Sequence, residues 1–171
     1  MKKNIALVGF MATGKTEVGR DLAAKMSMKY VSVDEEIEFR EKRSIKEIFG
    51  SEGEPYFRNL EKEVIKALLV DQGQIIDCGG GAVMDEENLN NLKASGSVFC
   101  LWADPEEILK RVGTCSKRPL LNVDDPMKKI KELLEKRRSC YLKADFHIDT
   151  TKKRPGEISD AIRRMVDDSG E

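Results

Sequence analysis

Apolar positions along the chain fall into short runs separated by longer segments with helical spacing. Five short runs have the length and branched composition of buried strands: 5–8, 29–32, 74–77, 97–102 and 146–149. Apolar residues three and four positions apart predict amphipathic helices over 17–26, 56–70 and 155–166. Because the two kinds of segment alternate to the end of the chain, we predict one α/β domain over 1–171 with a doubly wound, five-stranded parallel sheet.

Capping residues predict where the shorter helices begin and end. After a helix over 35–42, Ser44 and Glu47 have capping-box spacing for a further short helix, which we expect to end at Gly50. Asp104 and Asp125 are each followed by proline, a residue favoured in the first turn, so each predicts a helix start.

Residues 113–124, between the helices that follow Asp104 and Asp125, show no periodicity. This stretch contains two basic residues, Lys117 and Arg118. A long, basic, irregular segment next to a binding site is typical of a mobile lid, and we predict one here.

Composition excludes several classes of protein. The chain has 171 residues, 40% of them hydrophobic and 36% charged, and a net charge of −1, so we expect no nucleic-acid or membrane partner. The N-terminus leads directly into the first strand, from which we expect a cytoplasmic protein. Four widely separated cysteines and one histidine, His147, lack zinc-ligand spacing, so we expect reduced thiols and a structural histidine.

Residues 9–16 read G-F-M-A-T-G-K-T, a complete phosphate-binding loop between a predicted strand and a predicted helix. Gly9 and Gly14 allow backbone N–H groups to face phosphate oxygens. We expect Lys15 to reach the β- and γ-phosphates and the Thr16 hydroxyl to bind Mg²⁺. The sequence therefore predicts binding of a nucleoside triphosphate with Mg²⁺.

Two acidic residues follow predicted strands. Asp77 follows the third strand and precedes glycines, as expected of a carboxylate near the metal, although an ordinary strand-end cap is the alternative. Asp34 comes at the end of the second predicted strand. Because ligands gather at the carboxyl ends of parallel strands, we expect both acids to face one cleft.

Three arginines indicate the kind of molecule that accepts the phosphoryl group. Arg58 and Glu61 lie three positions apart on one helix, so Glu61 can orient Arg58. Arg118 lies on the predicted lid and Arg137 on the following helix. Planar guanidinium groups suit a carboxylate or a transferring phosphoryl group, whereas each arginine taken singly is more typical of a solvated surface.

Six segments, in this order, resemble the shikimate kinase family of phosphate-loop kinases, whose fold is of the nucleoside monophosphate kinase-like type. They are G-F-M-x-x-G-K-T at 9–16, V-D-E-E-I-E at 33–38, E-P-Y-F-R-N-L-E at 54–61, G-G-G-A-V at 79–83, R-P-L-L at 118–121, and Arg137 four residues before Tyr141. The phosphate loop is generic, but the other segments together are specific, and they span nearly the whole chain.

The resemblance implies ATP-dependent phosphorylation of the 3-hydroxyl of shikimate, giving shikimate 3-phosphate and ADP. The acceptor would bind around a helical region at about 34–61, where Asp34 would bond ring hydroxyls and accept or orient the reacting proton. Arg58 and Arg137 would hold the shikimate carboxylate, the backbone of Gly79, Gly80 and Gly81 would contact the substrate, and Arg118 would reach the transferring phosphoryl group.

The resemblance also implies three overlapping sets of residues and a monomer. The catalytic set is Lys15, Asp34 and Arg118. The metal set is Thr16 and Ser32, to which we add Asp77 because of its place at the end of the third predicted strand. The ATP-binding set is Ala12, Thr13, Gly14, Lys15, Thr16, Glu17, Arg111, Arg118, Lys153 and Arg154.

Two positions depart from the family pattern. Ser32 stands where the family usually has an aspartate near the metal, and we hypothesise that Asp77 replaces this charge from the adjacent strand. Ala12 stands where a glycine is frequent, a mild change if the backbone there is right-handed.

Other functions fit the sequence less well. A kinase for another hydroxy acid such as gluconate would share the loop and lid, but not the match of Arg58, Arg137 and the triple glycine. A regulatory nucleotide-binding protein with weak turnover is the alternative that Ser32 suggests. A nucleoside monophosphate kinase is disfavoured by residues arranged for a carboxylate, and a GTPase by the lack of an N-K-x-D segment.

Overall fold

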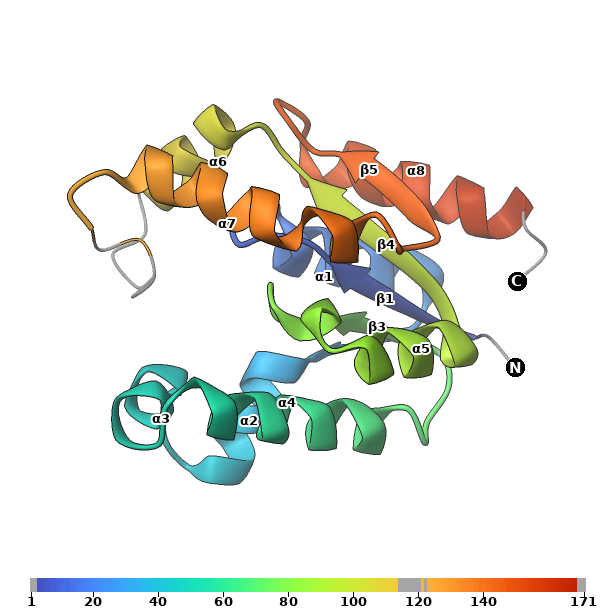
Figure 1. Ribbon diagram of the computed structural model, residues 1–171. Helices are drawn as coiled ribbons and strands as arrows, with labels where there is room; N and C mark the ends of the chain where they lie inside the picture. Colours follow the sequence, from blue (N-terminus) through green and yellow to red (C-terminus); the bar gives the residue numbers. More distant parts are fainter. Residues whose placement is uncertain (1–2, 114–120, 122, 169–171) are drawn as a thin grey trace.

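The computed structural model describes residues 3–113, 121 and 123–168, which contain a five-stranded parallel sheet with helices on both faces (Figure 1). The strand order is β2-β3-β1-β4-β5. The strands are β1 (Asn4–Val8), β2 (Lys29–Ser32), β3 (Gln74–Asp77), β4 (Gly96–Trp102) and β5 (Phe146–Asp149). This confirms the predicted doubly wound α/β sheet.

Helices connect the strands and follow the last one. They are α1 (Lys15–Met26), α2 (Val33–Glu41), α3 (Ile45–Ser51), α4 (Glu54–Leu68), the 3₁₀ turn η1 (Ala82–Met84), α5 (Glu86–Ser95), α6 (Pro105–Val112), α7 (Pro126–Tyr141) and α8 (Pro155–Asp168). None of the helices in the described ranges is long and apolar enough to cross a membrane.

Side chains alternate across the sheet and divide the core into two parts. Ile5 and Leu7 of β1 pack against α1 and α8 on one face. Ala6 and Val8 face the opposite side, where α4, α5 and α7 supply the core. The inner strands β1, β3 and β4 are buried on both faces over most of their length, whereas the edge strands β2 and β5 are partly exposed.

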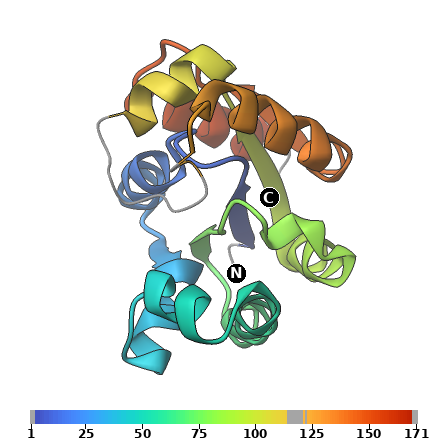
Figure 2. The same ribbon diagram turned by 60° about the vertical axis from the view of Figure 1, so that its left-hand side comes forward.

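The carboxyl ends of β1, β2 and β3 meet at one edge of the sheet. In the parallel register Leu7 pairs with Asp77, and Asp77 pairs with Ser32. Helices α2, α3 and α4 gather on one side of the β1–α1 connection, and α6 and α7 lie on the other (Figure 2). Residues from both groups can therefore reach the phosphate loop.

The structure differs from the expected boundaries at Asp34 and Gly50, and it contains one helix that was not expected. Asp34 does not end β2, because Ser32 caps α2 and places Asp34 in its first turn. Gly50 does not end α3, which extends to Ser51 although its Ser44 capping box is confirmed. Helix α5 was not anticipated, because its polar sequence offers few apolar positions beyond Leu89 and Leu92.

The starts of α6 and α7 agree with the predicted proline signals. Asp125 accepts from the backbone N–H of Lys128, as expected of an N-cap, whereas the Asp104 side chain makes no capping hydrogen bond. Of the predicted lid at 113–124, residues 114–120 and 122 lie outside the described residues, and so do Lys117 and Arg118.

Candidate active site

The phosphate loop leaves β1 at Gly9 and enters α1 at Lys15. Gly9 has φ +131°, and a Cβ there would overlap the carbonyl oxygen of Leu101 on β4, so only glycine fits. Gly14 has φ +94° and directly precedes the helix. The first backbone N–H groups of α1 therefore point into the loop, as expected of a helix N-terminus that binds an anion.

Ala12 does not have the right-handed conformation that would make its substitution for glycine a mild change. Its φ is +59°, in the left-handed region, which costs a non-glycine residue about 1–2 kcal/mol. Arg111 of α6 donates to the Ala12 carbonyl oxygen over 3.1 Å and to the Thr150 carbonyl oxygen over 2.8 Å. The substitution is therefore not conformationally mild, and Arg111 fixes the strained residue to the segment after β5.

Lys15 lies against the inner side of the loop. Its Nζ donates to the carbonyl oxygens of Gly9 at 2.9 Å and Phe10 at 3.0 Å. The buried Thr13 hydroxyl donates to the same Phe10 carbonyl over 2.8 Å. These contacts hold the ammonium group at the loop, where a phosphate oxygen can become an additional acceptor.

Thr16 and Asp77 are in direct contact. The Thr16 hydroxyl donates to Oδ2 of Asp77 over 2.7 Å, and the Tyr30 hydroxyl donates to the same oxygen over 2.9 Å. Ser32, the strand neighbour of Asp77, uses its hydroxyl oxygen to accept from the backbone N–H of Glu35 at 3.2 Å. Asp77 is thus the carboxylate adjacent to the Thr16 hydroxyl, while Ser32 caps α2.

These oxygen groups fit a Mg²⁺ ion. Within the described ranges no three His, Cys, Asp or Glu side chains cluster as a metal cage. Mg²⁺ in nucleotide sites is usually bound by one or two carboxylates and by phosphate oxygens, and it keeps several water ligands. The Thr16 hydroxyl and the Asp77 carboxylate are therefore enough ligands for the protein to supply.

A second group of charges surrounds Gly79. A Cβ on Gly79 would lie 2.7 Å from Glu61 Oε1 and 3.1 Å from Asp34 Oδ1, so both carboxylates face this glycine. Glu61 is 1% exposed, and its Oε1 has no hydrogen-bond partner within the described structure. Burial raises the pKa of the Glu61 carboxyl, and the Arg58 guanidinium opposes that rise.

Arg58 extends from α4 toward the triple glycine. Its Nη1 donates to Glu61 Oε2 over 2.7 Å, in agreement with the expected orientation of Arg58 by Glu61. Gly81 has an ordinary φ of −109°, but a Cβ there would overlap the guanidinium. The glycine is needed for space rather than for backbone conformation.

Arg137 reaches the same place from α7. It is buried, its Nη1 donates to the Gly80 carbonyl oxygen over 3.3 Å, and its guanidinium lies 5.6 Å from the centre of the Phe10 ring. The Tyr141 hydroxyl donates to the same carbonyl over 2.5 Å, and burial raises the pKa of Tyr141 to about 12, so this hydroxyl remains a donor at neutral pH. Helices α4 and α7 and the triple glycine thus place Arg58 and Arg137 around Asp34 and Glu61, which we call the acidic pair.

Glu17, Arg111, Lys153 and Arg154, which we also expect to bind ATP, lie on α1, on α6 and between β5 and α8. Glu17 is exposed in the first turn of α1. Lys153 Nζ donates to the Asp149 carbonyl oxygen over 2.9 Å, and exposed Arg154 pairs with Glu157. Arg111 joins this segment to the loop, whereas Arg118 lies outside the described residues.

Tyr30 is the residue at this site that sequence reasoning missed. It pairs with Ile75 in register, two positions before the Ser32–Asp77 pair, so the period of a strand places Tyr30 and Asp77 on the same face. The spacing of Tyr30 along the strand could have predicted this contact only if the pairing of β2 with β3 had been known. Without that pairing, Tyr30 is typical of any aromatic residue in a strand.

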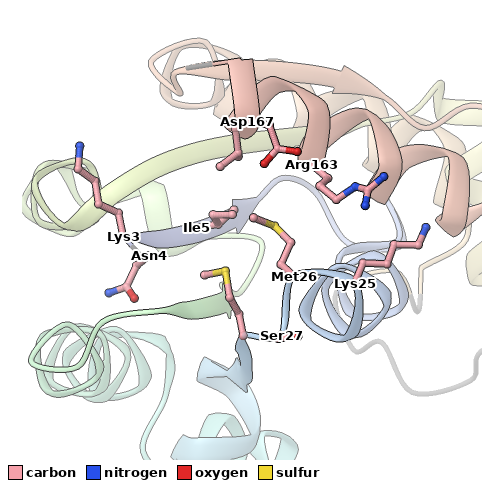
Figure 3. Close-up of a pocket in the computed structure, with 10 residues that line it drawn as sticks. Lys3, Asn4, Ile5, Lys25, Met26, Ser27, Arg163 and Asp167 are labelled. Carbon is pink, nitrogen blue, oxygen red and sulfur yellow. The ribbon is translucent and has the colours of Figure 1, made fainter. Parts of the chain in front are cut away.

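A separate cavity of about 360 Å³ lies at the opposite end of β1 (Figure 3). Asn4 and Ile5 line it at the start of the strand, together with Met26 and Ser27 after α1 and Arg163 from α8. None of the residues of the phosphate loop or of the acidic pair lines this cavity, so we do not assign it to the active site.

We expect Gly81→Ala to raise the KM for the acceptor about tenfold, because the added methyl group displaces the Arg58 guanidinium and weakens a charge-assisted contact. The KM for ATP should change less than twofold. Steady-state kinetics with each substrate varied test this. Gly50→Ala, whose Cβ meets no atom within 4 Å, is the matched control. An unchanged acceptor KM in Gly81→Ala would remove Gly81 from the site.

Comparisons with known proteins show the family to which the chain is similar. The family model described as shikimate kinase matches residues 11–167. The shikimate kinase of Thermodesulfovibrio yellowstonii is 46% identical over 160 residues, which are 94% of this chain and 92% of that protein. The shikimate kinase of Persephonella marina is 42% identical over 160 residues, which are 94% of this chain and 96% of that protein.

A solved structure extends the likeness to three dimensions. Shikimate kinase from Acinetobacter baumannii in complex with shikimate superimposes with a TM-score of 0.94 at 34% identity, and the match covers 99% of this chain and 95% of that one. The match in family model, sequence and fold shows that this chain belongs to the shikimate kinase family.

Proposed function

We propose that this chain transfers the γ-phosphoryl group of ATP to the 3-hydroxyl of shikimate, with the residue roles given below. The observation that carries the proposal is the convergence of Asp34, Glu61, Arg58 and Arg137 on the triple glycine, beside a phosphate loop. A hydroxylated carboxylic acid needs cationic groups for its carboxylate and an acceptor for its hydroxyls, and this cluster offers both.

The two arginines bind the carboxylate of shikimate. Arg58 is oriented by Glu61 and Arg137 by the Gly80 carbonyl, so both guanidinium groups are preorganised before the ligand arrives. Preorganisation lowers the entropy lost on binding and directs the hydroxyl face of the ring toward Asp34. The backbone of Gly79–Gly81 forms the floor of this site.

Asp34 acts on the reacting hydroxyl. Its carboxylate accepts a hydrogen bond from the hydroxyl and takes or orients the proton as the oxygen attacks phosphorus. The bond between phosphorus and the β–γ bridging oxygen breaks, and the new bond joins phosphorus to the 3-oxygen. Lys15 stabilises the charge on the transferring group, and Arg118 contributes from the predicted lid.

The phosphate loop and its neighbours hold MgATP. Backbone N–H groups of Ala12–Thr16 receive the phosphates, and Arg111, Lys153 and Arg154 surround the base. Thr16 and Asp77 hold Mg²⁺, with Ser32 at the edge of this site. A bound ion would neutralise the negative charge that develops on the phosphate oxygens.

ADP release by the purified protein with MgATP tests the reaction. We expect shikimate to raise the rate at least a hundredfold over the rate without acceptor, whereas gluconate should leave it near that background. A separate expectation is that the protein elutes as a monomer in size-exclusion chromatography.

In the ADP-release experiment, stimulation by gluconate alone would assign another acceptor. ATP binding without stimulation by either acid would indicate a nucleotide-binding protein that does not turn over.

A further inference from the structure

The hydroxyl of Tyr30 has no role in the reaction described above, yet it contacts the metal-site carboxylate. It donates to Asp77 Oδ2 over 2.9 Å, the oxygen that also accepts from Thr16 over 2.7 Å. One carboxylate oxygen is thus held by two donors from different elements.

Packing fixes the ring of Tyr30 independently of this hydrogen bond. A Cβ on Gly19 would lie 2.9 Å from Cε2 of the ring, so α1 packs directly against the tyrosine. On the exposed side the Arg20 guanidinium lies 5.3 Å from the ring centre, and Arg20 pairs with Glu35 over 2.9 Å. These contacts hold the ring, and with it the hydroxyl, beside the carboxylate.

We propose that Tyr30 is a positioning residue for the magnesium site, holding the Asp77 carboxylate against Thr16; this inference rests on the proposed function. A carboxylate with a single donor can rotate, whereas two donors on one oxygen restrict that rotation. The Thr16 proton is then directed to Asp77, which leaves the lone pairs of its oxygen for the ion. The Ser32 hydroxyl oxygen already accepts from the backbone N–H of Glu35. The Asp77 carboxylate, held by Tyr30, is therefore the group at this edge of the site that is positioned to bind the ion.

Tyr30→Phe tests this inference because it removes the hydroxyl and keeps the ring that packs under Gly19. The probe is Mn²⁺, titrated into the enzyme with a non-hydrolysable ATP analogue and followed by electron paramagnetic resonance. We expect the Kd of Mn²⁺ to rise roughly fivefold, the effect of losing one hydrogen bond to the carboxylate. The affinity for the analogue without metal and the KM for shikimate should change less than twofold.

A double-mutant cycle with Asp77→Asn separates positioning from a general structural effect. If Tyr30 acts through Asp77, Tyr30→Phe has no further effect on the Mn²⁺ affinity in the Asp77→Asn background. Tyr56→Phe removes a hydroxyl that donates to the Glu41 carboxylate at 3.3 Å, and it should leave the Mn²⁺ affinity unchanged.

The outcomes are distinct. An unchanged Mn²⁺ Kd in Tyr30→Phe, or an equal loss in the Asp77→Asn background, would overturn the inference. An unchanged Kd in Asp77→Asn would overturn it together with the metal role of Asp77, while shikimate-dependent ADP release in the wild-type protein would still support the kinase function. Failure of that release, with the Mn²⁺ effects as expected, would reject the function and keep the metal site.

Discussion

Asp34→Asn should lower kcat for shikimate-dependent ADP release about a thousandfold, the middle of the range for removal of a general base. The asparagine amide keeps the size of the side chain and its place in the first turn of α2, but it cannot accept the proton of the attacking hydroxyl. The KM for ATP should change less than threefold, because Asp34 lies in the acidic pair and not on the phosphate loop. Steady-state kinetics at saturating MgATP measure both quantities.

Glu86→Gln is the matched control for Asp34→Asn. Glu86 also occupies the first turn of a helix, α5, but its side chain is at the surface and pairs with Lys143 over 2.7 Å. This variant should retain wild-type kcat within a factor of two. If Asp34→Asn keeps more than a tenth of wild-type kcat, the carboxylate neither takes nor orients the proton, and positioning with electrostatics alone would account for the rate.

Arg58→Met should raise the KM for shikimate at least a hundredfold and lower the free energy of unfolding by about 3 kcal/mol. The first effect follows from loss of a carboxylate-binding guanidinium. The second follows because Glu61, 1% exposed, loses the ion pair that Arg58 makes with it over 2.7 Å. Kinetics and urea unfolding measure the two effects on one preparation.

The second effect should depend on pH. The Glu61 carboxyl binds its proton more tightly in the folded than in the unfolded protein, because burial raises its pKa. Removing Arg58 should widen this difference, so the stability of Arg58→Met should fall as pH rises above the unfolded pKa of Glu61 toward neutrality. Below that pKa both states bind the proton and the stability should be largely restored.

Neutralising Glu61 separates the two effects of Arg58→Met. Arg58→Met combined with Glu61→Gln should recover most of the lost stability and lose its pH dependence, while the KM for shikimate stays high. Arg40→Met, which breaks an exposed pair with Glu36, should cost less than about 0.5 kcal/mol. A double variant as unstable as Arg58→Met would show that the buried charge is not the cause.

Local patterns explain why the sequence allowed so much of this site to be predicted. The strand, glycine loop and helix at 5–26 are adjacent in the chain, and each boundary has its own residue signal. Arg58 and Glu61 share a helix face through their spacing alone. The sequence was less informative where backbone conformation decides: Asp34 was placed at the end of a strand but lies in the first turn of α2, and Ala12 is left-handed, so the condition for a mild substitution is not met.

The sequence by itself determined the alternation of strands and helices apart from α5, the phosphate loop and the residue types that bind a carboxylate, because these follow from periodicity and short-range chemistry. The tertiary structure decided which of them meet. The pairing of β2 with β3 brings Tyr30 and Asp77 together, and the packing of α4 and α7 around the triple glycine brings Arg58 and Arg137 to one acidic pair. Such contacts depend on strand register and on the space that glycines leave because they have no side chain. Both are set only when the whole chain packs.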